Sequence, residues 1–340
     1  MDQAKSLAFW SGVSPAANRF ALPGIADKTK PIENEETTGR GAMSITTADH
    51  TAQKGDVRLF MRQKRPSVAA DRGTILFVHG STWAGLPTFD LQVPGRANSS
   101  VLDFFADQGF DAWTIDNEGY GLSDKSRQIT CDVANGADDL EAAARYIQAK
   151  NGAQPLMIYG ISSGALKAAL FAQRRPAMVS RLVLDAFVWT GENSPTLIER
   201  RKKLDYWSSR IRRPIDLAYV HSVFNRDHPG VADEAVIVAL ANATLAQGNE
   251  VPTGSYIDMC AHLPLVDPRK ITVPTGILRG EFDGVASYDD VRAFFDLLPN
   301  QDKMLTIMPG IAHASFQEKN YMTVLHYLLA FVSAPQAIYR

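Results

Sequence analysis

The sequence predicts an α/β fold, with a mostly parallel sheet covered by helices on both faces. Short apolar runs that are typical of buried strands alternate with longer stretches of helical periodicity. The 340 residues are 45% hydrophobic, which is enough for a large core. The net charge of −2 lacks the basic excess of a nucleic-acid-binding protein, and no apolar run approaches the length of a membrane span.

The expected elements follow one another along the chain in that alternating order. Residues 1–43 are rich in Pro, Gly, Glu and Thr and are expected to form an irregular N-terminal arm. A first antiparallel pair is expected at residues 44–47 and 56–62, where apolar and polar side chains alternate. Buried strands are then predicted at residues 74–78, 110–115, 155–159, 182–184, 275–279 and 304–308. Helices are predicted at residues 101–108, 132–150, 165–175 and 320–332.

Residues 188–265 interrupt this alternation. The segment is mostly of helical character and contains no expected buried strand. We expect a helical cap over the carboxyl edge of the sheet, where open α/β sheets hold their ligands. The core is then formed by residues 44–187 and 266–340. A basic run at residues 200–203 of the cap is either a solvated helix face or an attraction for an anionic substrate.

A serine lies between two glycines where a predicted strand turns into a helix. Gly160, Ser162 and Gly164 have the spacing of a nucleophile elbow, in which the turn is too tight for larger neighbours. The helix N-terminus directs free N–H groups at the same place. Ser162 is therefore the predicted nucleophile, although the spacing alone has low specificity.

A serine hydroxyl needs a base and an orienting acid, which follow it in that fold as acid and then histidine. His313 lies in the loop after the last expected strand, on the same sheet edge as Ser162, and is the predicted base. Asp283 follows the preceding strand and is the predicted acid. Asp185 and Glu281 are the alternatives, of which Glu281 is expected to point away from the histidine.

A tetrahedral intermediate needs two hydrogen-bond donors for its oxyanion. The backbone N–H of Ser163, directly after the nucleophile, is the first predicted donor. The backbone N–H of Ser81, in the loop after His79 and Gly80, is the second, with Thr82 in reserve. The hydroxyl of Ser81 is a third candidate.

With these positions in agreement, residues from about 44 to 333 resemble the α/β-hydrolase fold family. The loop at residues 116–123 resembles that family's Asp-x-Arg-Gly-x-Gly-x-Ser motif, with Glu118 in place of the arginine. The resemblance implies no metal and no organic cofactor. It also implies that a serine, rather than an aspartate, at the elbow argues against dehalogenases and epoxide hydrolases. We therefore expect a capped serine esterase that cleaves a carboxylic ester through an acyl-enzyme.

Two alternatives remain open on the same residues. One is a carbon–carbon bond hydrolase or an acyltransferase that uses the same three side chains. The other is a ligand receptor built on this fold.

Aromatic side chains near the expected site suggest the kind of ester. Thr82 and Trp83 follow the oxyanion strand, while Phe187 and Trp189 begin the cap. They predict a pocket for an aromatic or medium-sized ester, or are ordinary contacts between cap and core. The chain also resembles bacterial hydrolases of aromatic monoesters, including phthalate monoesters, which implies a substrate with a free carboxylate.

Other patterns carry less chemistry. Tyr146 and Lys150 match the Tyr-x-x-x-Lys pair of short-chain dehydrogenases, but no Gly-rich dinucleotide turn accompanies them. Cys131 and Cys260 form no metal or disulfide pattern and are expected to be free thiols. Without a recognisable secretory signal, the expected location is the cytoplasm. The expected partner is a small-molecule ester, with no nucleic acid and no membrane, and a homodimer is compatible with the sequence.

Overall fold

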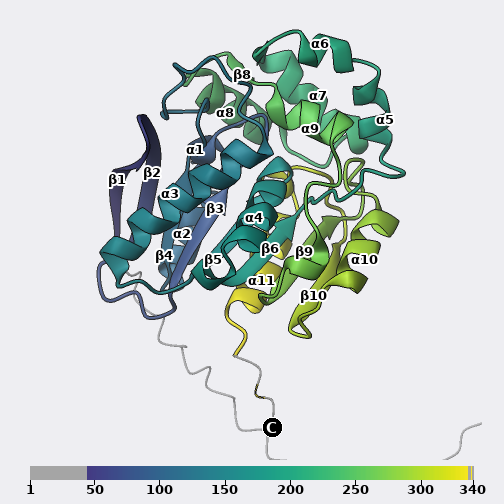
Figure 1. The fold of residues 1–340 in the computed structure, drawn as a ribbon. Coiled ribbons are helices and arrows are strands. Elements are labelled where there is room, and N and C mark those ends of the chain that lie inside the picture. Colours follow the sequence, from purple (N-terminus) through teal and green to yellow (C-terminus); the bar gives the residue numbers. More distant parts are fainter. Residues whose placement is uncertain (1–43, 336–337, 339–340) are drawn as a thin grey trace, which may run out of the picture. The chain divides into compact units, whose positions relative to one another are not determined.

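The computed structural model describes residues 44–335 and residue 338. The predicted N-terminal arm, residues 1–43, lies outside the described residues. The described part contains a sheet of eight strands in the order β1-β2-β4-β3-β5-β6-β9-β10 (Figure 1). Their bounds are β1 Ile45–Lys54, β2 Val57–Pro66, β3 Thr74–Val78, β4 Asp111–Ile115, β5 Leu156–Ile161, β6 Val179–Asp185, β9 Thr275–Gly280 and β10 Lys303–Met308.

The sheet is parallel except at one edge. β1 and β2 form an antiparallel hairpin, and β2 pairs antiparallel with β4. All further neighbours, from β4 through β3, β5, β6 and β9 to β10, are parallel. Both hairpin strands are longer than the sequence predicted, because polar side chains at the exposed edge hide the strand pattern. The carboxyl ends of the parallel strands therefore meet at one edge of the sheet.

Helices cover both faces of the sheet and divide the core into two layers. Leu76 and Val78 of β3 point into the layer under α3, α4 and α10, whereas Ile75 and Phe77 point into the layer under α2 and α11. The bounds are α2 Val101–Asp107, α3 Val133–Asn151, α4 Ser163–Arg174, α10 Tyr288–Leu297 and α11 Tyr321–Val332. The sequence predicted all of these except α10. A short helix, α1 (Gly85–Phe89), was also not predicted.

The chain between β6 and β9, residues 186–274, is called the inserted segment below. It carries α5 Pro195–Arg201, α6 Leu204–Ser208, α7 Leu217–Asp227, α8 Glu234–Leu245 and α9 Gly254–Ala261. Figure 1 shows these helices gathered over one end of the sheet. The segment also contains β7 (Arg212–Pro214) and β8 (Glu250–Pro252), which pair antiparallel. The sequence predicted no buried strand here, and it did not predict these two short strands, because strands of three residues leave no readable alternation. The predicted cap boundaries, 188–265, stay a prediction.

The inserted segment packs on the core through an apolar cluster of its own. Trp83, Leu91 and Val93, in the chain after β3, contact α7 and α8 through side chains that include Val220 and Phe224. This contact holds the segment next to the loop that follows β3. Within the described residues, no helix is both long and apolar enough to cross a membrane.

Candidate active site

Ser162 occupies a strained turn between β5 and α4. Its backbone has φ 57° and ψ −124°, which is unusual for a residue with a side chain. A Cβ on Gly160 would lie 2.3 Å from the carbonyl oxygen of Gly164, and a Cβ on Gly164 would lie 2.3 Å from that of Val78. Both positions therefore require glycine, as the spacing predicted.

A continuous hydrogen-bonded chain connects Ser162 to two residues from distant loops. His313 Nε2 lies 3.0 Å from Ser162 Oγ, and His313 Nδ1 lies 2.9 Å from Asp283 Oδ1. A carboxylate accepts hydrogen bonds only, so the Nδ1 of a neutral His313 carries the proton and Nε2 is free to accept the serine proton. The structure thus brings together the three predicted catalytic residues in the geometry that nucleophilic catalysis requires.

The surroundings of His313 favour its protonated form. Burial alone lowers the pKa of this imidazole, but Asp283 and, more weakly, Asp227 raise it above its usual value overall. Asp227 ends α7, and its side chain is only 3% exposed. It is held by Arg226 in an ion pair of 2.6 Å. His313 therefore faces two carboxylates.

The two alternative acids have other partners. Asp185 is buried at the end of β6 and accepts a 2.5 Å hydrogen bond from the hydroxyl of Tyr159. Glu281 accepts from the backbone N–H of Gly310, so it turns away from His313 as expected. Neither carboxylate makes a hydrogen bond to His313 in the described structure.

The predicted oxyanion donors lie on the two sides of Ser162. Ser163 is the first residue of α4, and Gly80 approaches so closely that a Cβ on it would be 3.3 Å from Ser162 Cβ. Among the described residues, the N–H groups of Ser81, Thr82 and Ser163 donate to no protein acceptor. The three groups are therefore free to bind an oxyanion, and the structure does not choose between Ser81 and Thr82.

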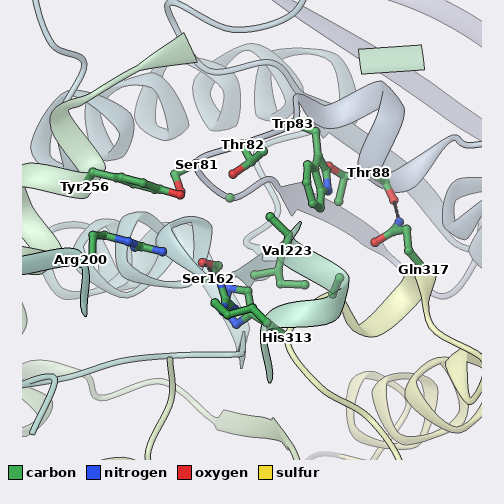
Figure 2. Close-up of a pocket in the computed structure, with 14 residues that line it drawn as sticks. Ser81, Thr82, Trp83, Thr88, Ser162, Arg200, Val223, Tyr256, His313 and Gln317 are labelled. Atoms are coloured by element: carbon green, nitrogen blue, oxygen red, sulfur yellow. Dashed lines mark hydrogen bonds between the residues drawn. The ribbon is translucent and has the colours of Figure 1, made fainter. Parts of the chain in front are cut away.

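Ser162 and His313 open into a pocket of about 510 Å³, counting its solvent-open part. Thr82 and Trp83 line it as predicted, and Figure 2 shows both side chains across the pocket from His313. Trp83 stacks on Phe224 with the rings 8° from parallel, which gives the pocket a rigid apolar wall. The complete lining is Gly80, Ser81, Thr82, Trp83, Thr88, Ile161, Ser162, Arg200, Val223, Arg226, Tyr256, His313, Ala314 and Gln317.

The other two predicted substrate-binding residues are not part of this pocket. Phe187 is fully buried against Phe294, with ring centroids 4.6 Å apart. Trp189 packs on the same ring, and its indole N–H donates to the carbonyl of Val266. The prediction for Phe187 and Trp189 was wrong, because β6 leads these aromatic side chains under α10 instead of toward Ser162.

Sequence reasoning missed most of the polar lining. Arg226 and Tyr256 belong to no motif, while Arg200 was noted only as part of the basic run. In Figure 2 the guanidinium of Arg200 points toward Ser162, beside the ring of Tyr256. Its Cζ lies 3.8 Å from that ring centroid. Among the described residues Arg200 forms no ion pair, so the pocket contains a positive charge without a carboxylate partner.

Tyr256 shares this positive environment. Burial raises the pKa of its hydroxyl, but Arg200 and Arg213 more than offset this effect and lower the pKa to about 7. Its oxygen also makes a short hydrogen bond with the hydroxyl of Tyr219. The rest of the basic run lies outside the pocket: Arg201 is half-buried and donates to the carbonyl of Cys260, and Lys202 is exposed and pairs with Glu199.

Glu118, the departure from the family motif, lies outside the pocket lining. It is buried and forms ion pairs with Lys54 and Arg127. These cations offset the cost of burial and lower the pKa of Glu118 to about 2. Glu118 is therefore a charged anchor for its loop.

One group of side chains has the spacing of metal ligands. Donor atoms of Asp227, Asp283 and His313 lie within 4.8 Å of one another. Each is already engaged by a protein partner: Asp227 by Arg226, and Asp283 and His313 by each other. The donor set therefore fits the hydrogen-bonded chain to Ser162 better than an ion.

Comparison with known proteins agrees with this architecture. The family model described as serine aminopeptidase, S33, matches residues 91–320. A monoacylglycerol lipase from Mycolicibacterium smegmatis is 22% identical over 83% of this chain and 96% of its own length.

Two solved structures bear the same fold. An esterase from Exiguobacterium antarcticum superposes with a TM-score of 0.63 and 15% identity, covering 84% of this chain and all of its own. The E-2-(acetamidomethylene)succinate hydrolase superposes with a TM-score of 0.61 and 20% identity, covering 85% of this chain and all of its own. These likenesses confirm the fold class that the sequence predicts.

Proposed function

The chain belongs to the serine aminopeptidase S33 family of α/β hydrolases, and from this premise we propose that it is a carboxylic ester hydrolase with Ser162 as its nucleophile. The observation that carries the proposal is the unbroken chain from Asp283 through His313 to Ser162, which ends in a pocket. Its relatives include a lipase and an esterase, which agrees with ester cleavage.

The geometry supports a two-step reaction. His313 Nε2 takes the proton of Ser162 while Oγ attacks the ester carbonyl carbon, and N–H groups of Ser163 and of Ser81 or Thr82 bind the oxyanion. The bond to the leaving alkoxide breaks as His313 returns the proton to its oxygen. Water, deprotonated by His313, then attacks the acyl-enzyme and releases the carboxylic acid and free Ser162.

The charge of the pocket favours a substrate with a free carboxylate. Within the described part of the chain Arg200 has no carboxylate partner, whereas the guanidinium of Arg226, which also lines the pocket, is paired with Asp227. A guanidinium binds a carboxylate through two parallel hydrogen bonds. The free α-ammonium of an aminopeptidase substrate would instead be repelled. We therefore favour an anionic ester over a peptide N-terminus.

The apolar side of the same pocket favours a flat or medium-sized hydrocarbon group. Trp83, Val223 and Ile161 supply this surface, and Trp83 is held in place by its stacking on Phe224. An aromatic monoester that retains one carboxylate offers both the ring and the charge that this lining fits. The proposed substrate class is thus an aryl or medium-sized alkyl monoester of a dicarboxylic acid.

Matched pairs of esters test the proposal. Ethyl benzoate and monoethyl phthalate share the ring and the scissile bond but differ by one carboxylate. We expect kcat/KM to be at least about tenfold higher for the charged ester, a difference of about 1.4 kcal/mol. The Ser162→Ala variant should fold normally and lose turnover of both. Full activity in that variant would disprove the assigned nucleophile, and equal rates for the two esters would disprove the carboxylate preference alone.

A further inference from the structure

We infer that Arg213, in β7 of the inserted segment, is a positioning residue for the oxyanion loop. This name is used for residues 80–82, which follow β3 in the core. This inference rests on the proposed function, because it concerns the loop that binds the oxyanion. Arg213 lies far from Ser162 in the sequence and does not line the pocket. It acts on the reaction through residues 81 and 82.

Arg213 bridges the two parts of the molecule. Its side chain is only 1% exposed, and its Nη2 donates to the carbonyl oxygen of Ser81 at 2.8 Å and to the hydroxyl of Thr82 at 3.2 Å. Its Cζ lies 4.0 Å from the ring centroid of Tyr256 and 5.0 Å from that of Tyr219. The guanidinium of Arg213 therefore packs against the rings of Tyr219 and Tyr256 and hydrogen-bonds to the loop after β3.

Burial disfavours the charged form of this arginine, but the hydroxyls of Tyr256, Tyr219 and Tyr120 more than offset this effect and raise its pKa. In the described residues it pairs with no carboxylate, and its Nε and Nη1 donate to no acceptor. Cation–π contacts with the rings of Tyr219 and Tyr256 add to this stabilisation. The tyrosines account for the buried charge, and the hydrogen bond to the carbonyl of Ser81 directs Nη2 at the loop after β3.

The oxyanion loop contains two successive peptide groups, Gly80–Ser81 and Ser81–Thr82. The hydrogen bond from Arg213 to the carbonyl of Ser81 fixes the second of them. The first is fixed by His79, whose Nε2 accepts from the N–H of Asn117, so that its Nδ1 carries the proton and donates to the carbonyl of Gly80 at 2.7 Å. In a planar trans peptide, the N–H points opposite to the carbonyl. His79 therefore orients the N–H of Ser81, and Arg213 orients the N–H of Thr82.

The two clamps come from different parts of the protein. His79 belongs to the core, whereas Arg213 belongs to the inserted segment. The oxyanion loop therefore reaches its full orientation only when the inserted segment is in place. The positive charge of Arg213, next to the carbonyl oxygen of Ser81, also polarises the peptide group that carries the Thr82 N–H. Both effects stabilise charge that develops in the transition state, so they act on kcat more than on KM.

The test compares Arg213→Met and Arg213→Lys with wild type. We expect Arg213→Met to lower kcat about tenfold to hundredfold with KM changed less than about threefold, which is below the loss from deleting a direct oxyanion donor. Arg213→Lys should recover part of this loss, because it keeps a charge and one donor. Affinity for an aryl boronic acid, which forms a tetrahedral adduct on Ser162, should fall by the same factor as kcat.

Arg212→Met is the matched control. Arg212 also lies in β7 and donates to a core carbonyl, that of Gly119, but it does not contact the oxyanion loop. It should leave kcat and boronate affinity unchanged. If Arg213→Met folds but keeps both values within about twofold of wild type, or if Arg212→Met reduces them equally, the inference is overturned. The rate of Ser162 labelling by a fluorophosphonate measures the same loop without any ester, so failure of the ester proposal is seen separately.

If Arg213→Met does not fold, Thr82→Val and Arg213→Lys carry the test. Thr82→Val removes only the 3.2 Å contact and leaves the bond to Ser81, so it should cost less than Arg213→Lys. The opposite order would contradict a role through the Ser81 carbonyl.

Discussion

The sheet edge around Ser162 and the inserted segment above it hold their charged side chains in different ways. At the edge, Asp283 accepts from His313 and from the backbone N–H groups of Val285 and Ala286. In the inserted segment, Arg200 and Arg213 face the ring of Tyr256, and neither has a carboxylate partner among residues 44–335. The edge therefore fixes a proton-transfer chain, while the segment supplies positive charge that tyrosine hydroxyls rather than carboxylates balance.

The difference assigns separate roles to the two regions. Paired and hydrogen-bonded groups keep a fixed geometry, which a nucleophile and its base require. Unpaired guanidiniums at a pocket retain their capacity to bind an anion. We therefore expect substitutions at the edge to reduce kcat, and substitutions of Arg200 in the segment to change which ester is bound.

The largest effect is expected from Asp283→Asn. An amide at this position stabilises the wrong tautomer of His313 and cannot stabilise the imidazolium, so kcat should fall by about 10⁴-fold. Steady-state hydrolysis of an aryl ester would measure this fall in kcat. Asp185→Asn is the control, because Asp185 contacts Tyr159 instead of His313, and it should cost less than about tenfold. Equal losses in the two variants would break the assignment of the acid.

This pair of aspartates also indicates what the sequence could predict. Ser162, Asp283 and His313 each follow a strand, and parallel strands bring their carboxyl ends together, so the chain order was sufficient to make them candidates. The same argument could not separate Asp185, which also ends a strand. Only the position of Tyr159 explains why Asp185 turns elsewhere.

The inserted segment was much less predictable. Arg213, Arg226 and Tyr256 come from separate short elements, and only tertiary packing brings them to the pocket region. Phe187 and Trp189 show the reverse error, since an aromatic side chain near a site in sequence is equally suited to the core. In an insertion of short helices, the sequence does not predict which side chains face the pocket, because that depends on how the helices pack on the core.

Phe294→Ala sharpens the comparison through stability. Phe294 is fully buried against Phe187 and Trp189, so its removal leaves a cavity and should lower the free energy of unfolding by about 3–5 kcal/mol. Urea denaturation would measure the loss. Because this cluster lies outside the pocket, kcat/KM of the folded protein should stay near the wild-type value. Altered ester selectivity in the variant would restore Phe187 and Trp189 as substrate-binding candidates.

Arg200→Met tests the charge of the segment. Removing the unpaired guanidinium should raise KM for monoethyl phthalate about tenfold, which corresponds to one charge-assisted hydrogen bond, and leave KM for ethyl benzoate unchanged. Lys202→Met is the matched control, since Lys202 pairs with Glu199 outside the pocket. A parallel change for both esters would mean that Arg200 shapes the pocket without recognising the carboxylate.

The smallest expected effect lies where the two regions meet, at Asp227 of α7. Its carboxylate raises the pKa of His313, and its own pKa is lowered by Arg226 despite burial, so it stays charged throughout the working range. His313 must be neutral to act as a base, so activity is lost as the pH falls through its pKa.

Asp227→Asn removes the negative charge and leaves Arg226 nearby, and both changes favour neutral His313. The acidic limb of kcat/KM should therefore move to lower pH. Thr196→Val removes a 3.3 Å hydrogen bond from an uncharged hydroxyl to Asp227 and keeps the charge of that carboxylate, so it should leave the limb in place. An unmoved limb in a stably folded Asp227→Asn variant would show that the segment acts on the substrate but not on the base.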